Sequence, residues 1–173
     1  MKKVILYIAT SADGFIADNQ GNVDWLPQPK NDNDLEIVGY NNLIQRIDTI
    51  VMGNNSYQQI KTFGAWGWPD KKTYVFTIEP MQSDVSYITF IQDTPKAFLQ
   101  KINRLPGKDI WLLGGAQLAQ SFAKENLIDE VILTIVPQKI DSGLPLGVSF
   151  SHFNLKEEKP LMDGMVQRIY FKK

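Results

Sequence analysis

The sequence predicts a three-layer α/β/α fold, in which helices cover both faces of a central, mostly parallel sheet. Apolar, β-forming runs alternate with amphipathic stretches over the first two thirds of the chain, which is typical of parallel strands joined by crossover helices. The C-terminal part instead holds two strand-like runs, 153–158 and 165–172, with the turn signal Asp163-Gly164 between them. We therefore expect antiparallel strands at one edge of the sheet.

Composition indicates one globular domain that spans 1–173, with 43% apolar residues, 21% charged residues and a formal net charge of −1. The chain has no cysteine and one histidine, His152, which excludes disulfides and metal sites built on cysteine or on two histidines. The charge balance gives no sign of a nucleic-acid or membrane surface. The apolar run at 4–9 is too short to span a membrane and has no cleavage pattern, so we expect a cytoplasmic protein.

The N-terminal third begins with a continuous apolar run at 4–10, as expected of a central strand covered on both faces. A loop at 11–14 follows, and 23–29 is an irregular segment with two prolines. A helix is expected to start near Asp32 or Asp34. Four apolar residues at helical spacing predict its core face: Ile37, Tyr40, Ile44 and Ile47.

The stretch 110–118 is the clearest signal of a ligand site. An apolar strand runs into Gly114 and Gly115, and an amphipathic helix over 116–125 begins at once. Adjacent glycines allow a tight turn and the close approach of another molecule, and N–H groups in the first helical turn can hold a phosphate. A plain structural turn is an equally good interpretation, because a lone glycine pair is a weak motif.

A second junction of this kind lies at Gly53, where a strand over 48–53 ends. Three good N-capping residues follow it, Asn54, Asn55 and Ser56. Further strands are expected over 72–77 and 87–92, and Thr94-Pro95 marks the start of another helix. Ligands of such sheets bind at the carboxyl ends of the strands, where both junctions, the 11–14 loop and Thr77 lie. This placement favours a nucleotide-type ligand.

Four segments carry a family resemblance: Ser11-x-Asp13-Gly14, Asp48-Thr49-Ile50-Val51-Met52-Gly53-x-x-Ser56-Tyr57, Leu113-Gly114-Gly115-Ala116-Gln117-Leu118 and Leu127-Ile128-Asp129-Glu130-x-x-Leu133. In this order they resemble the dihydrofolate reductase superfamily, and more closely its branch with the reductase domain of riboflavin biosynthesis. The resemblance covers nearly the whole chain. It implies a dihydrofolate reductase-like fold, NADPH as hydride donor, and a homodimer like its riboflavin-type relatives, for which the apolar 132–136 region could supply an interface.

The resemblance also implies a role for individual residues. The pyrophosphate of the cofactor would lie at Gly114, Gly115, Ala116, Gln117 and Leu118. The adenosine-side phosphate would lie at Gly53, Asn54, Asn55 and Ser56. Thr77 would lie near the adenine ribose and Ala9 near the nicotinamide, while Thr134 matches a threonine that faces the pterin in folate enzymes.

Two positions depart from the family pattern. Arginine usually follows the Met-Gly pair and faces the 2′-phosphate of NADPH, whereas Asn54 here brings no charge, so NADH is also possible. Folate reductases carry an acidic residue five positions after the tryptophan of a Trp-x-Leu-Pro segment. Here Trp25-Leu26-Pro27 is one residue shorter and Lys30 stands at the fifth position, which argues against dihydrofolate as the substrate.

Several single residues have both a functional and a structural interpretation. Asp13 is a candidate to line the substrate pocket or a turn residue, and Trp25 is a candidate to stack on a flat ring or to fill the core. Asp34 is the candidate proton donor, although helix capping explains it fully. Trp66 and Trp68 could form a lid, but a packed loop is favoured.

These observations predict an NAD(P)H-dependent reductase with a small-molecule substrate, either pterin-like or an aminopyrimidine ribose. The activity would be of the dihydrofolate reductase or 5-amino-6-(5-phosphoribosylamino)uracil reductase type, in which the cofactor supplies the hydride. One alternative is a nucleotide-binding module of the same fold that has lost catalysis. Another is a reductase of unrelated small molecules such as nitro or quinone compounds.

Overall fold

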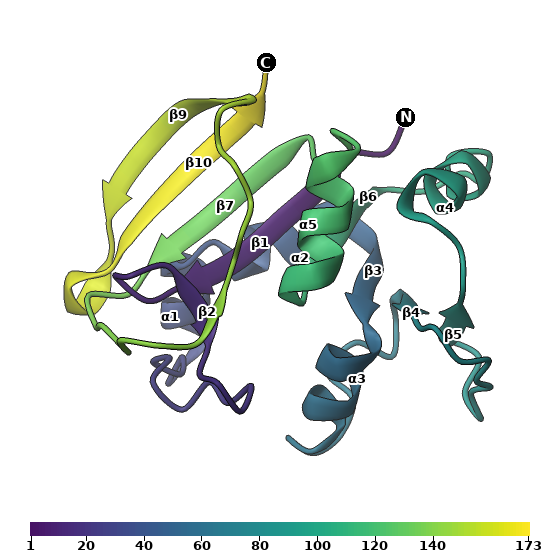
Figure 1. Ribbon diagram of the computed structural model, residues 1–173, viewed down its shortest axis with the longest axis horizontal. Coiled ribbons are helices and arrows are strands. Elements are labelled where there is room, and N and C mark those ends of the chain that lie inside the picture. The colour runs from purple at the N-terminus through teal and green to yellow at the C-terminus, as the bar shows by residue number, and fades with distance from the viewer.

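The computed structural model describes residues 1–173 and contains an eight-stranded sheet in the order β5-β4-β3-β6-β1-β7-β10-β9 (Figure 1). Its strands are β1 (Val4–Thr10), β3 (Ile47–Gly53), β4 (Lys72–Phe76), β5 (Ile88–Ile91), β6 (Asp109–Gly114), β7 (Glu130–Ile135), β9 (Phe153–Pro160) and β10 (Val166–Lys172). β5, β4, β3, β6, β1 and β7 are parallel to one another, and β10 and β9 add antiparallel pairs next to β7. The predicted mostly parallel sheet with an antiparallel edge is confirmed.

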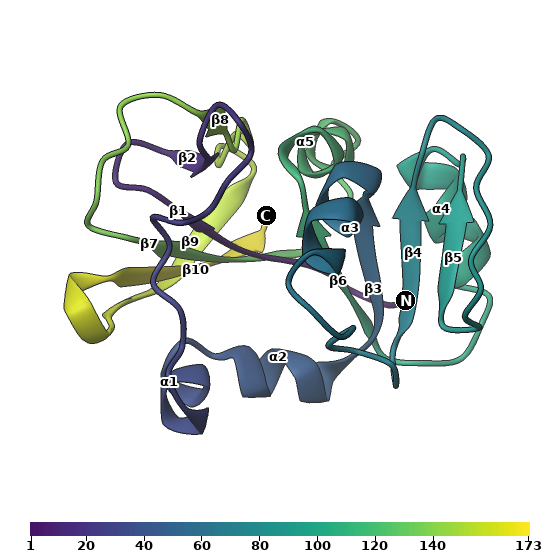
Figure 2. The same cartoon turned by 90° about the horizontal axis from the view of Figure 1, so that it is seen from below.

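Helices cover both faces of this sheet. They are α1 (Asp32–Ile37), α2 (Tyr40–Arg46), α3 (Asn54–Lys61), α4 (Pro95–Ile102) and α5 (Ala116–Lys124), with a 3-10 turn η1 (Met162–Gly164) in the C-terminal hairpin. Figure 2 shows α2 and α5 on opposite sides of the sheet. A separate two-stranded sheet pairs β2 (Phe15–Ala17) with β8 (Leu144–Pro145). No helix is both long enough and apolar enough to cross a membrane.

Two apolar cores lie on the two faces, because successive residues of a strand point to opposite sides. Leu6 of β1 joins the core under α4 and α5, where Phe98 and Phe122 are buried. Ile5, its neighbour, joins the core under α2 and α3 with Leu43 and Tyr57. Burial on both faces explains why the central strands read as continuous apolar runs in the sequence.

The expectation of one helix with a core face from Ile37 to Ile47 is wrong. α1 ends at Ile37 with Val38 as its C-cap, α2 begins after Gly39, whose φ is +77°, and Ile47 is the first residue of β3. In a continuous helix the Val38 carbonyl would accept a hydrogen bond from the helix itself. It instead accepts from the Tyr7 hydroxyl at 3.0 Å and from Gln167 Nε2 at 2.9 Å.

The capping residues of the other helices follow the sequence only in part. Thr94 caps α4 as predicted, since its hydroxyl accepts from the Ala97 N–H and Pro95 occupies the first turn. The expectation that Asn54, Asn55 and Ser56 precede and cap α3 is wrong, because these residues form its first turn. Gly53 stands at the cap position and has no side chain to offer. The first-turn N–H groups of α3 therefore receive no side-chain cap.

Candidate functional site

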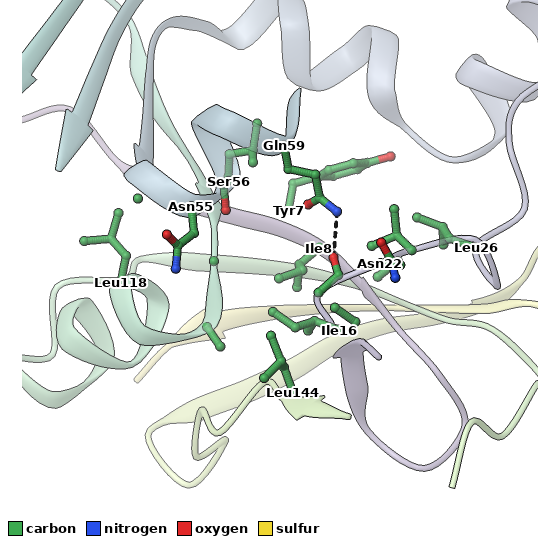
Figure 3. Close-up of a pocket in the computed structure, with 18 of the residues that line it drawn as sticks. Tyr7, Ile8, Ile16, Asn22, Leu26, Asn55, Ser56, Gln59, Leu118 and Leu144 are labelled. Carbon is green, nitrogen blue, oxygen red and sulfur yellow. Dashed lines mark hydrogen bonds between the residues drawn. The ribbon is translucent and has the colours of Figure 1, made fainter. Parts of the chain in front are cut away.

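The main cavity of the molecule lies at the carboxyl ends of β1, β3, β4, β6 and β7 and has a volume of about 2130 Å³. Small-molecule sites in proteins commonly have about 300–1,000 Å³. The cavity therefore has room for a dinucleotide and a second molecule beside it. Figure 3 shows Asn55, Ser56 and Leu118 toward one side of the space and Leu26 and Asn22 toward the other.

The two glycine junctions meet in this cavity. A Cβ placed on Gly53 would lie 3.9 Å from the Gly115 nitrogen, and a Cβ on Gly115 would lie 3.3 Å from Ser56 Oγ. Gly115 stands at the N-cap position of α5, and like Gly53 it gives its helix no side-chain cap. Two helix N-termini with uncapped first turns thus adjoin one space, where their dipoles and free N–H groups favour an anion.

Most of the cofactor-binding residues expected from the sequence line the cavity. They are Ala9, Gly53, Asn54, Asn55, Ser56, Thr77, Gly115, Ala116, Gln117 and Leu118. Gly114 does not line it, although Leu113 and Gly115 on either side do. Gly114 has a φ of +123°, so its part is to turn the chain between β6 and α5, which a residue with a side chain could do only under strain. What these residues bind stays a prediction.

Of the three expected substrate-binding residues, Thr134 lines the cavity and Asp13 and Trp25 do not. The Asp13 carboxylate accepts hydrogen bonds from the Ser11 hydroxyl at 2.6 Å and from the Asp141 N–H at 2.9 Å. The bond from Ser11, followed by the backbone bonds, holds the Asp13 pKa below its usual value although burial opposes this shift. Asp13 therefore connects the loop after β1 to the loop around Asp141. This geometry does not favour a role for Asp13 in substrate binding.

The segment around Trp25 contributes its neighbours to the cavity. Leu26 and Pro27 line the cavity, whereas the indole Nε1 of Trp25 is buried without a protein partner. A role for Trp25 at a flat ligand stays a prediction, and the position of Leu26 shows that the cavity wall here is aliphatic. No local pattern indicated that the residue after the tryptophan would face the cavity, because this segment has no regular periodicity.

Asp34 lies in the cavity wall and closes the start of α1. Its backbone N–H donates to Asn31 Oδ1 at 3.0 Å, and its carboxylate Oδ2 accepts from the Lys30 N–H at 2.8 Å. The first bond caps the helix, and the second ties the chain just before the cap to the first turn. Asp34 is thus both a capping residue and an acid at the ligand space, so its catalytic role stays a prediction.

A buried amide holds the Thr134 hydroxyl in the cavity wall. Gln167 is 1% exposed, and its Nε2 donates to Thr134 Oγ1 at 3.1 Å and to the Val38 carbonyl at 2.9 Å. Because Thr134 accepts from Gln167, its own proton is free for a group in the cavity. Burial, and then the nearby Tyr40, raise the pKa of Tyr7, so the hydroxyl that donates to Val38 stays protonated at neutral pH.

We expect removal of both donors to the Val38 carbonyl to lower the free energy of unfolding by more than the sum of the two single substitutions. Gln167→Met or Tyr7→Phe alone leaves the Val38 carbonyl one partner, so each should lower the free energy of unfolding by about 1–2 kcal/mol. The double variant leaves this carbonyl unpaired, which adds a further penalty of about 1–3 kcal/mol. Urea unfolding of the natural protein, the two single variants and the double variant measures this coupling energy. Strictly additive losses of unfolding free energy would contradict the expectation.

Several lining residues were not found from the sequence. Gln59 of α3 lines the cavity, and its Nε2 donates to the Gly21 carbonyl at 2.6 Å (Figure 3). Its spacing of three and four residues from Ser56 and Asn55 places it on their face of the helix and could have revealed it. Met162, Asp163 and Met165 reach the cavity from the C-terminal hairpin, a long-range contact that no local pattern indicates.

The tryptophans of the 64–69 loop form a packed loop rather than a lid, as favoured from the sequence. The rings of Trp66 and Trp68 lie edge to face at 5.5 Å, and Trp68 packs in the same way on Trp111 at 5.2 Å. Trp68 Nε1 also donates to the Tyr40 hydroxyl at 2.7 Å. Trp111 lines the cavity, so its fluorescence is a natural reporter of ligand binding.

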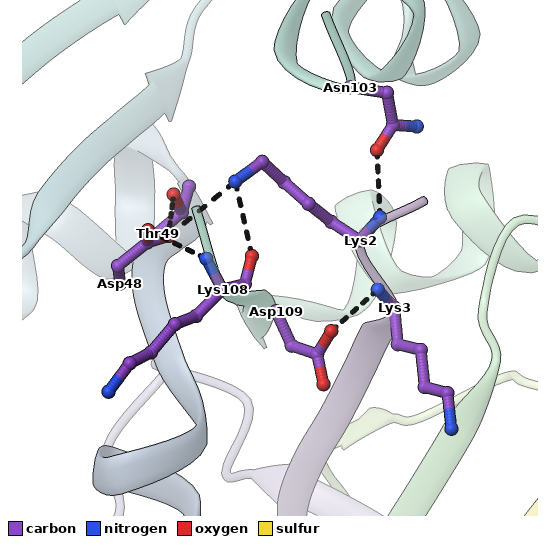
Figure 4. A network of polar contacts seen from close by, with 7 residues as sticks. All are labelled: Lys2, Lys3, Asp48, Thr49, Asn103, Lys108 and Asp109. Carbon is purple, nitrogen blue, oxygen red and sulfur yellow. Dashed lines mark hydrogen bonds and ion pairs between the residues drawn. The ribbon is translucent and has the colours of Figure 1, made fainter. Parts of the chain in front are cut away.

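The opposite end of the sheet holds a small cavity of about 130 Å³. Polar contacts connect the chain segments there (Figure 4). The Asp48 carboxylate accepts from the Lys108 N–H at 2.8 Å, and Lys2 Nζ lies 4.0 Å from it. Burial raises the Asp48 pKa, but the bonds from Lys108 and Thr49 and the lysine charges outweigh burial and lower it overall. Its contribution to stability is therefore present above its unfolded-state pKa and is lost as the pH falls through the lowered value.

We expect Gly107→Ala to destabilise this network without affecting the cavity. Gly107 has a φ of +148°, and an added Cβ would lie 2.3 Å from both Asp48 Oδ2 and Lys2 Nζ. The strained backbone should cost about 1–3 kcal/mol, seen as a lower midpoint of thermal unfolding. Gly67→Ala is the control, since nothing lies within 4 Å of that position and its φ is ordinary. Equal midpoints for the two variants would contradict the expectation.

Comparison with known proteins identifies the family. The model of the RibD C-terminal domain matches residues 2–140. The chain belongs to this family. Two Bacillus subtilis proteins are similar in sequence: the uncharacterized protein YwjB is 38% identical over 146 residues, covering 84% of this chain and 82% of YwjB. The uncharacterized protein YyaP is 34% identical over 190 residues, covering 98% of this chain and 94% of YyaP.

Three solved structures are similar in fold. A putative riboflavin biosynthesis protein from Shewanella matches with a TM-score of 0.85 and 28% identity over 99% of both chains. A Thermotoga maritima deaminase/5-amino-6-(5-phosphoribosylamino)uracil reductase matches with a TM-score of 0.74 and 12% identity, over 99% of this chain and 57% of that one. Enterococcus faecalis dihydrofolate reductase, solved with NADP(H), matches with a TM-score of 0.71 and 15% identity, over 99% and 96%. The family and fold expected from the sequence are confirmed.

Proposed function

We propose that this protein is a nicotinamide-dinucleotide-dependent reductase that acts on a flat, pterin-like or aminopyrimidine-ribose substrate. The observation that carries the proposal is the meeting of two uncapped helix N-termini, at Gly53 and Gly115, in a cavity with room for two ligands. The fold relatives that are named reductases support it.

The residues at the glycine junctions fit a dinucleotide. Gly53 and Gly115 leave open the space that side chains would fill, and the first turns of α3 and α5 supply N–H donors for the pyrophosphate. When bound there, the cofactor supplies the hydride. Ala9 of β1 is small and lines the cavity beyond these junctions, which leaves room for a nicotinamide ring against the strand.

The far side of the cavity fits a flat ring with polar edges. Leu26, Met162 and Met165 supply apolar surface, and Thr134 supplies a hydroxyl whose proton Gln167 leaves free. Such a wall binds the faces of a ring, while the threonine donates to a ring carbonyl or nitrogen and thereby fixes the ring's orientation. Asp34 and Asp163 are the carboxyl groups that line the cavity on this side and could deliver a proton.

The test is oxidation of NADPH and NADH, followed by absorbance, with a panel of pterins, aminopyrimidine ribosides, quinones and nitro compounds. We expect turnover with a pterin or aminopyrimidine and with no quinone or nitro compound. Cofactor binding without any turnover would favour the alternative, a nucleotide-binding module of this fold. Turnover with quinones alone would overturn the substrate class.

A further inference from the structure

We propose that the adenosine end of the cavity is built for an unphosphorylated ribose, so that NADH binds at least as tightly as NADPH. This inference rests on the proposed function and deepens it by naming the form of the cofactor. NADH and NADPH differ at the 2′ position of the adenosine ribose, which carries a hydroxyl in NADH and a phosphate in NADPH. The inference concerns the charged residues around that position.

Strand order identifies that end. The two glycine junctions lie on β3 and β6, the middle of the cavity, while Ala9 and Thr134 lie beyond them on β1 and β7. A dinucleotide with its pyrophosphate at the junctions and its nicotinamide toward β1 must extend its adenosine toward β4 and β5. The lining there comes from the segments after these two strands: Thr77, Ile78, Glu79, Gln92 and Asp93.

Most of the charged residues in the cavity wall are negative. Four are carboxylates, Asp34, Glu79, Asp93 and Asp163, and one is a cation, Lys30. Lys30 lies two residues before α1 in the chain, and Figure 2 shows α1 far from β4 and β5. No arginine lines the cavity. The adenosine end therefore presents carboxylates and no cation that faces the ligand.

The two carboxylates at this end differ in how far they are neutralised. Asp93 accepts from Lys101 Nζ at 2.8 and 2.9 Å, so most of its charge is balanced by a lysine that does not itself line the cavity. Glu79 is exposed and has no ion pair; its backbone N–H donates to the Thr77 hydroxyl at 3.2 Å, which fixes the loop. Glu79 is thus the uncompensated charge at this end of the cavity.

Asn54 is the other group that faces this position. It stands first in α3, and its Oδ1 accepts from Gln58 Nε2 at 3.2 Å, which orients its amide. An amide can donate to a ribose hydroxyl or to a phosphate, but it adds no charge to balance a dianion. A free 2′-hydroxyl can donate to a carboxylate such as Glu79, as the acidic residue of NAD sites does. A 2′-phosphate would meet the same carboxylate as a like charge.

The experiment titrates the full-length protein with NADH and with NADPH at low salt, following tryptophan quenching. Adenosine 5′-monophosphate and adenosine 2′,5′-bisphosphate are used as competitors. They differ only in the 2′-phosphate and lack the nicotinamide, so their comparison measures the effect of the 2′-phosphate alone. We expect the dissociation constant of NADH to be equal to or lower than that of NADPH, and the monophosphate to compete at least as well as the bisphosphate. High salt should narrow any difference, because surface charges are screened.

Two variants test the residues. Asn54→Arg should tighten NADPH about tenfold and change NADH less than twofold, since it adds a charge-assisted partner for the phosphate. Glu79→Gln should lower the dissociation constant of NADPH several-fold and should not lower that of NADH. Glu125→Gln, at the far end of α5 and outside the cavity lining, is the matched control and should change neither.

The outcomes separate the inference from the proposed function. NADPH bound ten times more tightly than NADH by the natural protein, with Glu79→Gln having no effect, would overturn the inference and leave the reductase proposal standing. Binding of neither dinucleotide would overturn the proposed function and this inference with it.

Discussion

Gly115→Asp should abolish dinucleotide binding while the protein stays folded. Gly115 has a φ of −70°, which residues with a side chain also adopt, so the substitution does not require a left-handed backbone. Its Cβ would lie 3.3 Å from Ser56 Oγ, so the hydroxyl must move by a few tenths of an ångström. The new carboxylate would then occupy the space between the N-termini of α3 and α5, where a helix dipole stabilises it.

The same carboxylate excludes the pyrophosphate both sterically and by charge. We expect the dissociation constant for NADH or NADPH to rise at least about 100-fold, which corresponds to about 2.8 kcal/mol. Tryptophan quenching measures it, with the far-ultraviolet circular dichroism spectrum and the unfolding midpoint as checks on the fold. Gly115→Ala is the control, since it adds the Cβ without the charge and should weaken binding only a few-fold. Unchanged affinity in Gly115→Asp would remove the glycine junctions from the cofactor site.

The position of this site was predictable because it depends on short-range sequence signals. Gly53 and Gly115 each follow an apolar strand directly and precede a helix, and parallel strands bring their carboxyl ends to one edge. Sequence alone therefore brought most of the residues around the two glycine junctions to one cavity, and what they bind stays a prediction. It could not place Met162 or Asp163, because these reach the cavity through the pairing of β10 with β7, a contact between distant parts of the chain.

Sequence reasoning was wrong about two helix boundaries. The apolar spacing of 37–47 suits one helix. However, Tyr7 and Gln167 donate hydrogen bonds to the Val38 carbonyl, and Gly39 turns the chain with a positive φ. Asn54 is a good capping residue by type, yet the helix starts one residue earlier than that role requires, with Gly53 at the cap. At 37–47 a local helical preference thus gives way to contacts that only the folded chain supplies.

Arg46→Met should be among the most destabilising single substitutions on the surface of this protein. Arg46 in the last turn of α2 donates from Nη1 to Glu130 Oε1 at 3.0 Å and from Nη2 to Oε2, which joins the helix to the start of β7. The bond to Glu130, with its charge, raises the Arg46 pKa although partial burial opposes this. The Glu130 side chain is 3% exposed and that of Arg46 31%.

Removal of the arginine leaves the Glu130 carboxylate buried without its partner. The loss of a buried partner typically costs about 3–5 kcal/mol, and because Arg46 is partly exposed we expect the lower end, about 3 kcal/mol, by urea unfolding. The double variant Arg46→Met/Glu130→Met should recover most of this loss, since it removes the buried charge as well. Arg168→Met is the matched control: its pair with Glu158 is 40% and 48% exposed, so it should cost less than about 1 kcal/mol. Equal losses for the two arginine variants would show that water reaches Glu130 and that the pair does not hold α2 on β7.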